Sequence, residues 1–130
     1  MRDLMNKVGS MEYDGLITDL TPPEQTRGGV IAKAATDATY KRGTIFARNT
    51  TDNKLYILGT TVSGQTFLPF GILCDDCVVT KDADLNQVLY TAGCFHPDKV
   101  AVKDGYDITA TDLDELRKRD IVFRLPHAAN

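Results

Sequence analysis

The sequence predicts a small, compact, mainly β domain of the α+β class, with one short C-terminal helix and an extended N-terminal arm. Three observations lead to this expectation. From about residue 30 onward, short apolar runs alternate with turn residues, as in β-rich domains. Helix-capping residues and helical spacing of leucines coincide near the C-terminus. Before residue 30, a proline pair and a glycine pair interrupt the pattern.

Residues 1–29 are expected to form the arm. Pro22 and Pro23 favour an extended polyproline conformation, and the glycines at positions 28 and 29 form a loose hinge before the first convincing strand. The β-rich body then spans residues 30–126. Residues 127–130 are expected to form a short tail.

Eight strands are expected in the body, each an apolar run bounded by turn residues. They lie at residues 30–34, 44–48, 55–58, 70–73, 77–79, 88–92, 100–102 and 121–125. Residues 50–53 are expected to form a hairpin loop, because Thr, Asp and Asn favour turns. The polar, glycine-flanked residues 59–65 are expected to form an exposed loop.

The expected helix begins after Thr111, whose side chain caps it, with Asp114 in the capping-box position. Leu113 and Leu116 share one face. Acidic residues occupy the first turn and the basic residues 117–119 the last, which the helix macrodipole favours at both ends. The basic triplet therefore has a structural explanation.

Charge and hydropathy exclude several classes of function. Fifteen Lys and Arg against eighteen Asp and Glu leave a net charge of -3, and no run of like charges exceeds three residues. Binding to nucleic acid through phosphate contacts is therefore not expected. No apolar run approaches the roughly 20 residues that cross a bilayer, and the first 25 residues lack a secretory signal. We expect synthesis in the cytoplasm and no membrane partner.

The residues also favour a protein without enzyme activity. Asp75 and Asp76 are adjacent, so in an extended chain they point to opposite faces, and they are better explained as a polar turn. Ser10 and Ser63 lie beside glycines in expected loops, with no pattern that supplies a base. Together these features predict a structural or binding module that needs no cofactor.

The cysteines provide the sharpest chemical alternative. Cys74, Cys77, Cys94 and His96 supply four groups that bind zinc, and the first two form a Cys-x-x-Cys motif that also occurs in thiol-redox proteins. The spacing of one residue between Cys94 and His96 is shorter than is usual at zinc sites. Free cysteine is also a common small apolar filler. We expect three reduced, unreactive thiols and keep a zinc or thiol-redox protein as the alternative.

Four motifs and a following Ile121 occur in an order that resembles a known family. They are Gly-Thr-Ile-Phe-Ala-Arg at 43–48, Gly-Ile-Leu-Cys-Asp-Asp at 71–76, Val-Leu-Tyr-Thr-Ala-Gly-Cys-Phe at 88–95 and Thr-Asp-Leu-Asp-Glu-Leu-Arg at 111–117. Over roughly residues 30–125 the chain resembles the head decoration proteins of tailed bacteriophages, of the lambda protein D type. Asp120 stands where family members often have glycine, and it tolerates the left-handed turn needed there.

The resemblance implies a structural virion protein. Such proteins form a homotrimer on the outer surface of the expanded head at local three-fold positions, where they clamp the major capsid protein and stabilise the shell. Their N-terminal segments pair with capsid strands, which is β-augmentation. By this resemblance, the arm residues that anchor to the capsid are Tyr13, Leu16, Ile17, Leu20, Pro22 and Pro23.

Two features depart from the family pattern. The arm is longer than in the smallest members, and the three cysteines are not part of the pattern. A second alternative is therefore another phage surface adaptor or a carbohydrate-binding β module. In that case the loop at residues 59–65 would be the working surface.

Overall fold

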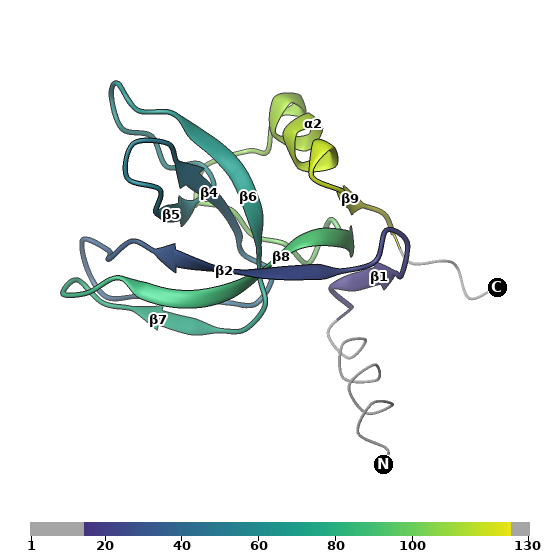
Figure 1. Cartoon of the computed structure of the whole chain (residues 1–130), viewed down its shortest axis with the longest axis horizontal. Helices are drawn as coiled ribbons and strands as arrows, with labels where there is room; N and C mark the ends of the chain where they lie inside the picture. Colours follow the sequence, from purple (N-terminus) through teal and green to yellow (C-terminus); the bar gives the residue numbers. More distant parts are fainter. Residues whose placement is uncertain (1–14, 126–130) are drawn as a thin grey trace, which may run out of the picture.

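The computed structural model describes residues 15–125, and this part of the chain is mainly β (Figure 1). Strands hold 42% of the residues and helix 8%, which confirms the expected class. The strands are β1 (Ile17–Asp19), β2 (Gln25–Ile31), β3 (Ala38–Tyr40), β4 (Ile45–Asn49), β5 (Leu55–Ile57), β6 (Phe67–Leu73), β7 (Cys77–Val79), β8 (Leu85–Phe95) and β9 (Ile121–Phe123). The helix is α2 (Ala110–Lys118).

Five strands close into a small barrel in the order β8, β2, β5, β4, β6 and back to β8. The pairings are antiparallel except for β2 with β5, which are parallel at Ile31 and Leu55. Strands β3 and β7 form a separate two-stranded sheet. Closure removes the free edges of the five barrel strands along the paired segments.

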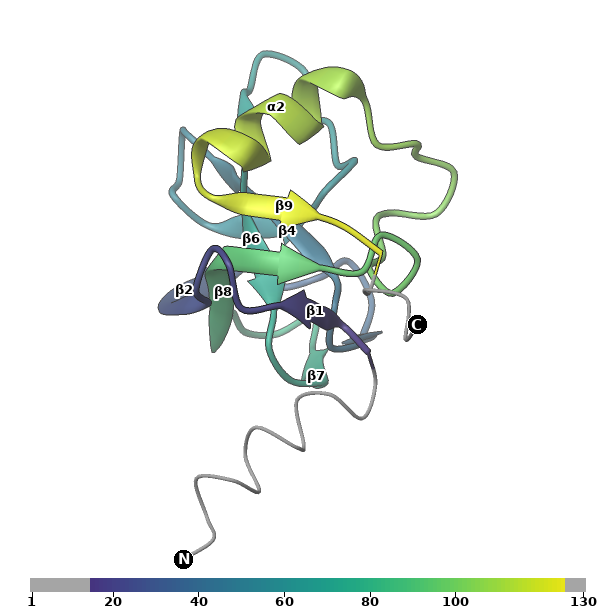
Figure 2. The ribbon, with the colours of Figure 1, turned by 90° about the vertical axis from the view of Figure 1, so that its right-hand side faces the viewer.

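The long strand β8 connects the barrel to a second layer. Its first part pairs with β2 and β6, and its last residues, Gly93 to Phe95, lie between β1 and β9 (Figure 2). Gly93 marks the transition, with a φ of 146° that residues with side chains rarely adopt. A Cβ at Gly93 would also lie 2.8 Å from Cζ of Phe95. The glycine at position 93 therefore allows β8 to pair with strands of both layers.

Alternate side chains of the barrel strands face two hydrophobic clusters. Ile45 and Ala47 of β4 pack in the cluster that includes Leu116 of α2, whereas Phe46 packs in the cluster that includes Leu55 and residues of β7. Strand β4 is thus buried on both faces, and its continuous apolar run follows from that burial. This is why residues 44–48 could be identified as a strand.

The helix begins two residues earlier than expected, so the predicted cap at Thr111 and Asp114 is corrected. Thr109 is the N-cap, and its side chain and backbone exchange hydrogen bonds with Asp112 at 3.0 and 3.1 Å. The sequence contains the Thr-x-x-Asp spacing twice, at Thr109 and Asp112 and at Thr111 and Asp114. The Tyr106 hydroxyl donates to Asp112, which selects the earlier pair.

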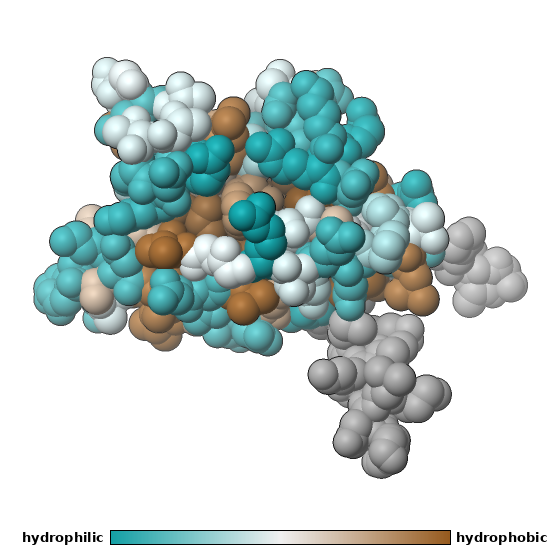
Figure 3. Space-filling view, viewed as in Figure 1, coloured by the Kyte–Doolittle hydropathy of each residue, from teal (hydrophilic) through white to brown (hydrophobic). Residues whose placement is uncertain are grey.

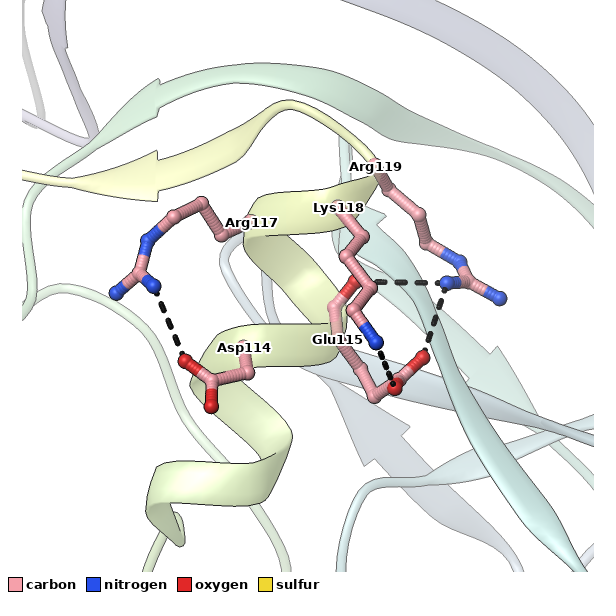
Figure 4. Close-up of polar contacts among 5 residues, drawn as sticks. All are labelled: Asp114, Glu115, Arg117, Lys118 and Arg119. Carbon is pink, nitrogen blue, oxygen red and sulfur yellow. Dashed lines mark hydrogen bonds and ion pairs between the residues drawn. The ribbon is translucent and has the colours of Figure 1, made fainter.

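The C-terminal half of α2 carries ion pairs between neighbouring turns (Figure 4). Arg117 contacts Asp114 at 3.0 Å, and Lys118 contacts Glu115 at 3.1 Å. Arg117 and Lys118 lie in the last turn, as the macrodipole favours, but Asp112 is the acidic residue of the first turn, because the earlier helix start leaves Asp114 and Glu115 beyond it. Asp120 follows with a φ of 65°, which confirms that it adopts the left-handed turn before β9.

The expected boundary between arm and body at residues 29 and 30 needs correction, because β2 crosses it. Gly28 and Gly29 are not a hinge: they pair with Val88 and Gln87 of β8. A Cβ at Gly29 would lie 2.6 Å from a methyl carbon of Leu55, so this glycine allows close packing. In addition, Leu16 lies in the core with 1% of its surface exposed. Residues 15–29 therefore belong to the folded body.

Other elements differ in extent. The expected strand at residues 100–102 is reduced to one bridge between Thr44 and Ala101, and β3 was not expected. Strand β8 is longer than the expected residues 88–92, because its polar start pairs with β2. The hairpin loop around Asn53 and the exposed loop at residues 61–66 lie where the sequence predicts loops.

Replacing Leu16 with alanine should lower the free energy of unfolding by about 2 to 5 kcal/mol, because it opens a cavity in the core. The matched change Leu20→Ala should alter it by less than about 0.5 kcal/mol, because Leu20 is exposed. Urea denaturation followed by circular dichroism measures both. Equal, small effects would show that the segment before β2 is not part of the cooperative fold.

Candidate partner-binding surface

The expected capsid-binding residues occupy different environments. Tyr13 lies outside the described residues. Leu16 is in the core, Ile17 is half-buried in β1, and Leu20 is exposed. Pro22 is half-buried and Pro23 exposed in the connection between β1 and β2. Leu16 therefore stabilises the body, and the candidate contacts in the described chain are reduced to Leu20, Pro23 and the strand β1.

Strand β1 has an open edge. Among the described residues it pairs with β8 alone, with Ile17 opposite Phe95 and Asp19 opposite Cys94. The Thr18 hydroxyl and the Cys94 thiol are 3.4 Å apart and add a side-chain contact to this pairing. On the other side of β8, α2 lies beside β9 (Figure 2). Among the described residues, the edge of β1 is thus the one in this layer that neither a further strand nor the helix covers.

Two exposed leucines lie beside this edge. The Arg124 guanidinium is 3.9 Å from the Asp19 carboxylate and donates to the Thr21 carbonyl at 3.5 Å. These contacts bring the segment that carries Leu20 next to the segment that carries Leu125. The side chains of Leu20 and Leu125 are 69% and 65% exposed.

We call the open edge of β1, Leu20 and Leu125 the terminal surface. Figure 3 shows hydrophobic residues exposed at the end of the molecule where β1 lies. The ion pair between Asp19 and Arg124 is partly exposed, so it contributes at most about 1 kcal/mol and acts mainly to hold the two segments together. Within residues 15–125, the surface combines a strand edge that pairs with no other strand with two apolar side chains, a combination that suits a partner that adds a strand.

Sequence reasoning identified Leu20 but not Leu125 or Arg124. Residue 125 was assigned to the last strand, which in the structure ends at Phe123. The contact between Arg124 and Thr21 spans 103 positions in the sequence. No local pattern in the sequence signals such a contact.

The three cysteines are buried and free, as expected. Burial raises the pKa of the Cys74 thiol to about 12, and the Asp75 carboxylate adds to the effect. Burial and the Asp76 carboxylate also raise the pKa of Cys77. These thiols are therefore protonated at neutral pH, whereas a nucleophile or metal ligand needs the thiolate.

The structure does not bring the expected zinc ligands together. Cys74 packs in the cluster with α2, whereas Cys77 packs in the other hydrophobic cluster. His96 accepts a hydrogen bond from the Asp98 backbone at 3.0 Å through Nδ1. Within residues 15–125, no three His, Cys, Asp or Glu side chains are placed to hold a metal ion.

The acidic pair is a polar turn, as expected. Asp75 and Asp76 are exposed in a bend between β6 and β7, and Asp76 accepts a hydrogen bond from the Arg42 backbone at 2.7 Å. No helix in the described part of the chain is long and apolar enough to span a bilayer. No model of a known protein family matches the sequence, and no curated protein is significantly similar to it. The terminal surface is therefore the candidate site that the geometry itself supports.

The thiols should react slowly with a disulfide reagent at about pH 8, because all three are buried and burial raises the pKa of Cys74 and Cys77. In denaturant all three should react rapidly, because unfolding exposes them to the reagent. The folded state holds the Cys74 proton more tightly, so stability should also fall as the pH rises from 9.0 toward 12. Absorbance of the released thiolate measures the labelling. Rapid reaction of one native thiol would contradict the assignment.

Proposed function

We propose that the chain is a structural decoration protein of a tailed bacteriophage head. Made in the host cytoplasm, it binds the outer surface of the expanded capsid as a trimer at local three-fold sites and stabilises the shell. The observation that carries the proposal is the open edge of β1 beside the exposed Leu20 and Leu125. The ordered family-like motifs in a small, mainly β body give further support.

The motifs form the framework that presents this surface. Residues 43–48 cover most of β4, residues 71–76 begin with the last residues of β6, and residues 88–95 are most of β8. Residues 111–117 lie within α2. Because β8 pairs directly with β1, the family-like core and the terminal surface are parts of one sheet. The resemblance and the candidate surface therefore support the same function.

In the proposed mechanism a strand of the major capsid protein adds to the edge of β1. Backbone hydrogen bonds supply affinity, and Leu20 and Leu125 bury apolar surface against the partner. Three copies in a trimer gain avidity from modest contacts. Preferential binding to the expanded lattice then shifts the capsid toward that state.

The combined change Leu20→Asp with Leu125→Asp should weaken binding to expanded heads at least about tenfold, because it places charges in an apolar contact. The change Val78→Asp is the control: Val78 is 57% exposed but lies on β7, outside the terminal surface. Co-sedimentation with expanded heads measures the affinity. Wild-type affinity of the double variant would contradict the proposal.

Deletion of residues 1–14 should leave the strands and the buried Leu16 intact, because all the described strands and Leu16 itself lie after residue 14. It should weaken binding to heads if the preceding segment, which contains Tyr13, contributes to the contact. Circular dichroism checks the fold and co-sedimentation the binding. Full retention of binding by the shortened chain would refute the role of the arm. Deletion to residue 29 cannot serve as the test, because it removes β1 and most of β2.

A further inference from the structure

A cavity of about 350 Å³ lies among the barrel strands and the end of α2. Six residues from β2, β4, β6, β8 and the helix end line it. They are Gln25, Arg27, Arg48, Phe70, Thr91 and Arg119. Three of the six are arginines, and they come from parts of the chain far apart in the sequence. The fold therefore concentrates positive charge at one concave site on a chain whose net charge is -3.

Two of the arginines have no carboxylate partner among residues 15–125. Arg27 lies over the ring of Phe70, with its guanidinium carbon 5.9 Å from the ring centre. Stacking on an aromatic ring leaves the in-plane N–H donors unused. Arg48 donates one hydrogen bond, at 2.8 Å, to the side-chain oxygen of Asn53. Most N–H donors of both guanidinium groups therefore remain for a ligand.

The third arginine shares a carboxylate with a lysine. Arg119 lies 3.6 Å from Glu115, whose other oxygen is 3.1 Å from Lys118 (Figure 4). One negative charge thus faces two positive charges at this end of the helix. The Arg119 side chain is 33% exposed and points to the opposite side of α2 from Arg117. The carboxylate near the cavity does not neutralise its three guanidinium groups.

Neutral donors complete the lining. Gln25 and Thr91, whose side chains carry an amide and a hydroxyl, also line the cavity. Guanidinium groups that line one cavity repel one another unless an anion lies between them. The volume of about 350 Å³ leaves room for one small anion.

The number and origin of the arginines select the class of anion. A carboxylate has two oxygens in one plane, which suit a single guanidinium fork. A phosphate group has oxygens in several directions and carries up to two charges, so it accepts from donors that approach from several strands. We propose that this cavity binds a phosphate-type oxyanion through Arg27, Arg48 and Arg119. This inference does not depend on the proposed function, because the cavity does not include the terminal surface.

Titration with inorganic phosphate, followed by amide chemical shifts at constant ionic strength, tests the proposal. We expect saturable shifts centred on the cavity residues, with sodium chloride producing none. The changes Arg27→Gln and Arg48→Gln should each raise the Kd at least about tenfold, because each removes charge-assisted hydrogen bonds. The control Arg117→Gln should leave the Kd unchanged, because Arg117 does not line the cavity and lies on the opposite side of α2 from Arg119.

Arg27 is exposed, so Arg27→Gln remains a test if Arg48→Gln does not fold. The absence of saturable shifts, or an equal effect of Arg117→Gln, would overturn the proposal, as would tighter binding of succinate than of phosphate. Phosphoserine and pyrophosphate distinguish the source of the group. Tighter binding of phosphoserine would indicate a phosphate carried by a larger molecule, and tighter binding of inorganic phosphate or pyrophosphate a free anion. Both results support a phosphate site, because they differ only in the molecule that carries the phosphate group.

Discussion

The pairing of β8 with β6 closes the barrel, and most other features of the described chain depend on it. Ile72 and Leu73 lie opposite Tyr90 and Leu89, so the two buried clusters are separated along this seam. The strands approach so closely at Gly71 that a Cβ there would lie 2.5 Å from the Tyr90 carbonyl oxygen. A residue without a side chain is therefore needed at this position. With the barrel closed, the remainder of β8 extends beyond it and provides the pairing positions for β1 and β9.

The sequence was informative where burial on both faces produced an apolar run. Strand β4 and the helix could be recognised because their signals are local. Strand β2 was missed in part, because Gly28 and Gly29 read locally as a hinge and only their pairing with β8 makes them strand residues. Two threonines, Thr109 and Thr111, could each cap the start of the helix by the local pattern. The contact between Tyr106 and Asp112 favours Thr109. The full extent of β2 and the start of the helix depend on long-range contacts, so the sequence alone did not predict them. Strand β4 and the presence of the helix depend on local pattern, so they could be predicted.

The candidate sites show the same division. Exposed Leu20 was identified from its place in a segment with few apolar residues, but its neighbour Leu125 depends on a contact between the two ends of the described chain. The Cys-x-x-Cys motif suggested a metal or redox centre, yet the bend after Cys74 directs the next strand into a different cluster. The arginine cavity has no sequence signature, because its residues come from five elements and are gathered only by the closure of the barrel.

The positions of β1 and β9 have a practical consequence for protein engineering. Both strands flank β8 at Phe95, so the first and last strands of the described chain lie on the two sides of one residue. A reporter or affinity tag fused directly before residue 15 or after residue 125 would therefore lie at the same pole of the molecule, beside Leu20 and Leu125. The exposed residues 61–66 form a loop elsewhere in the structure and provide a better position for inserted peptides or fluorescent labels. A tag at that loop would leave the terminal surface uncovered.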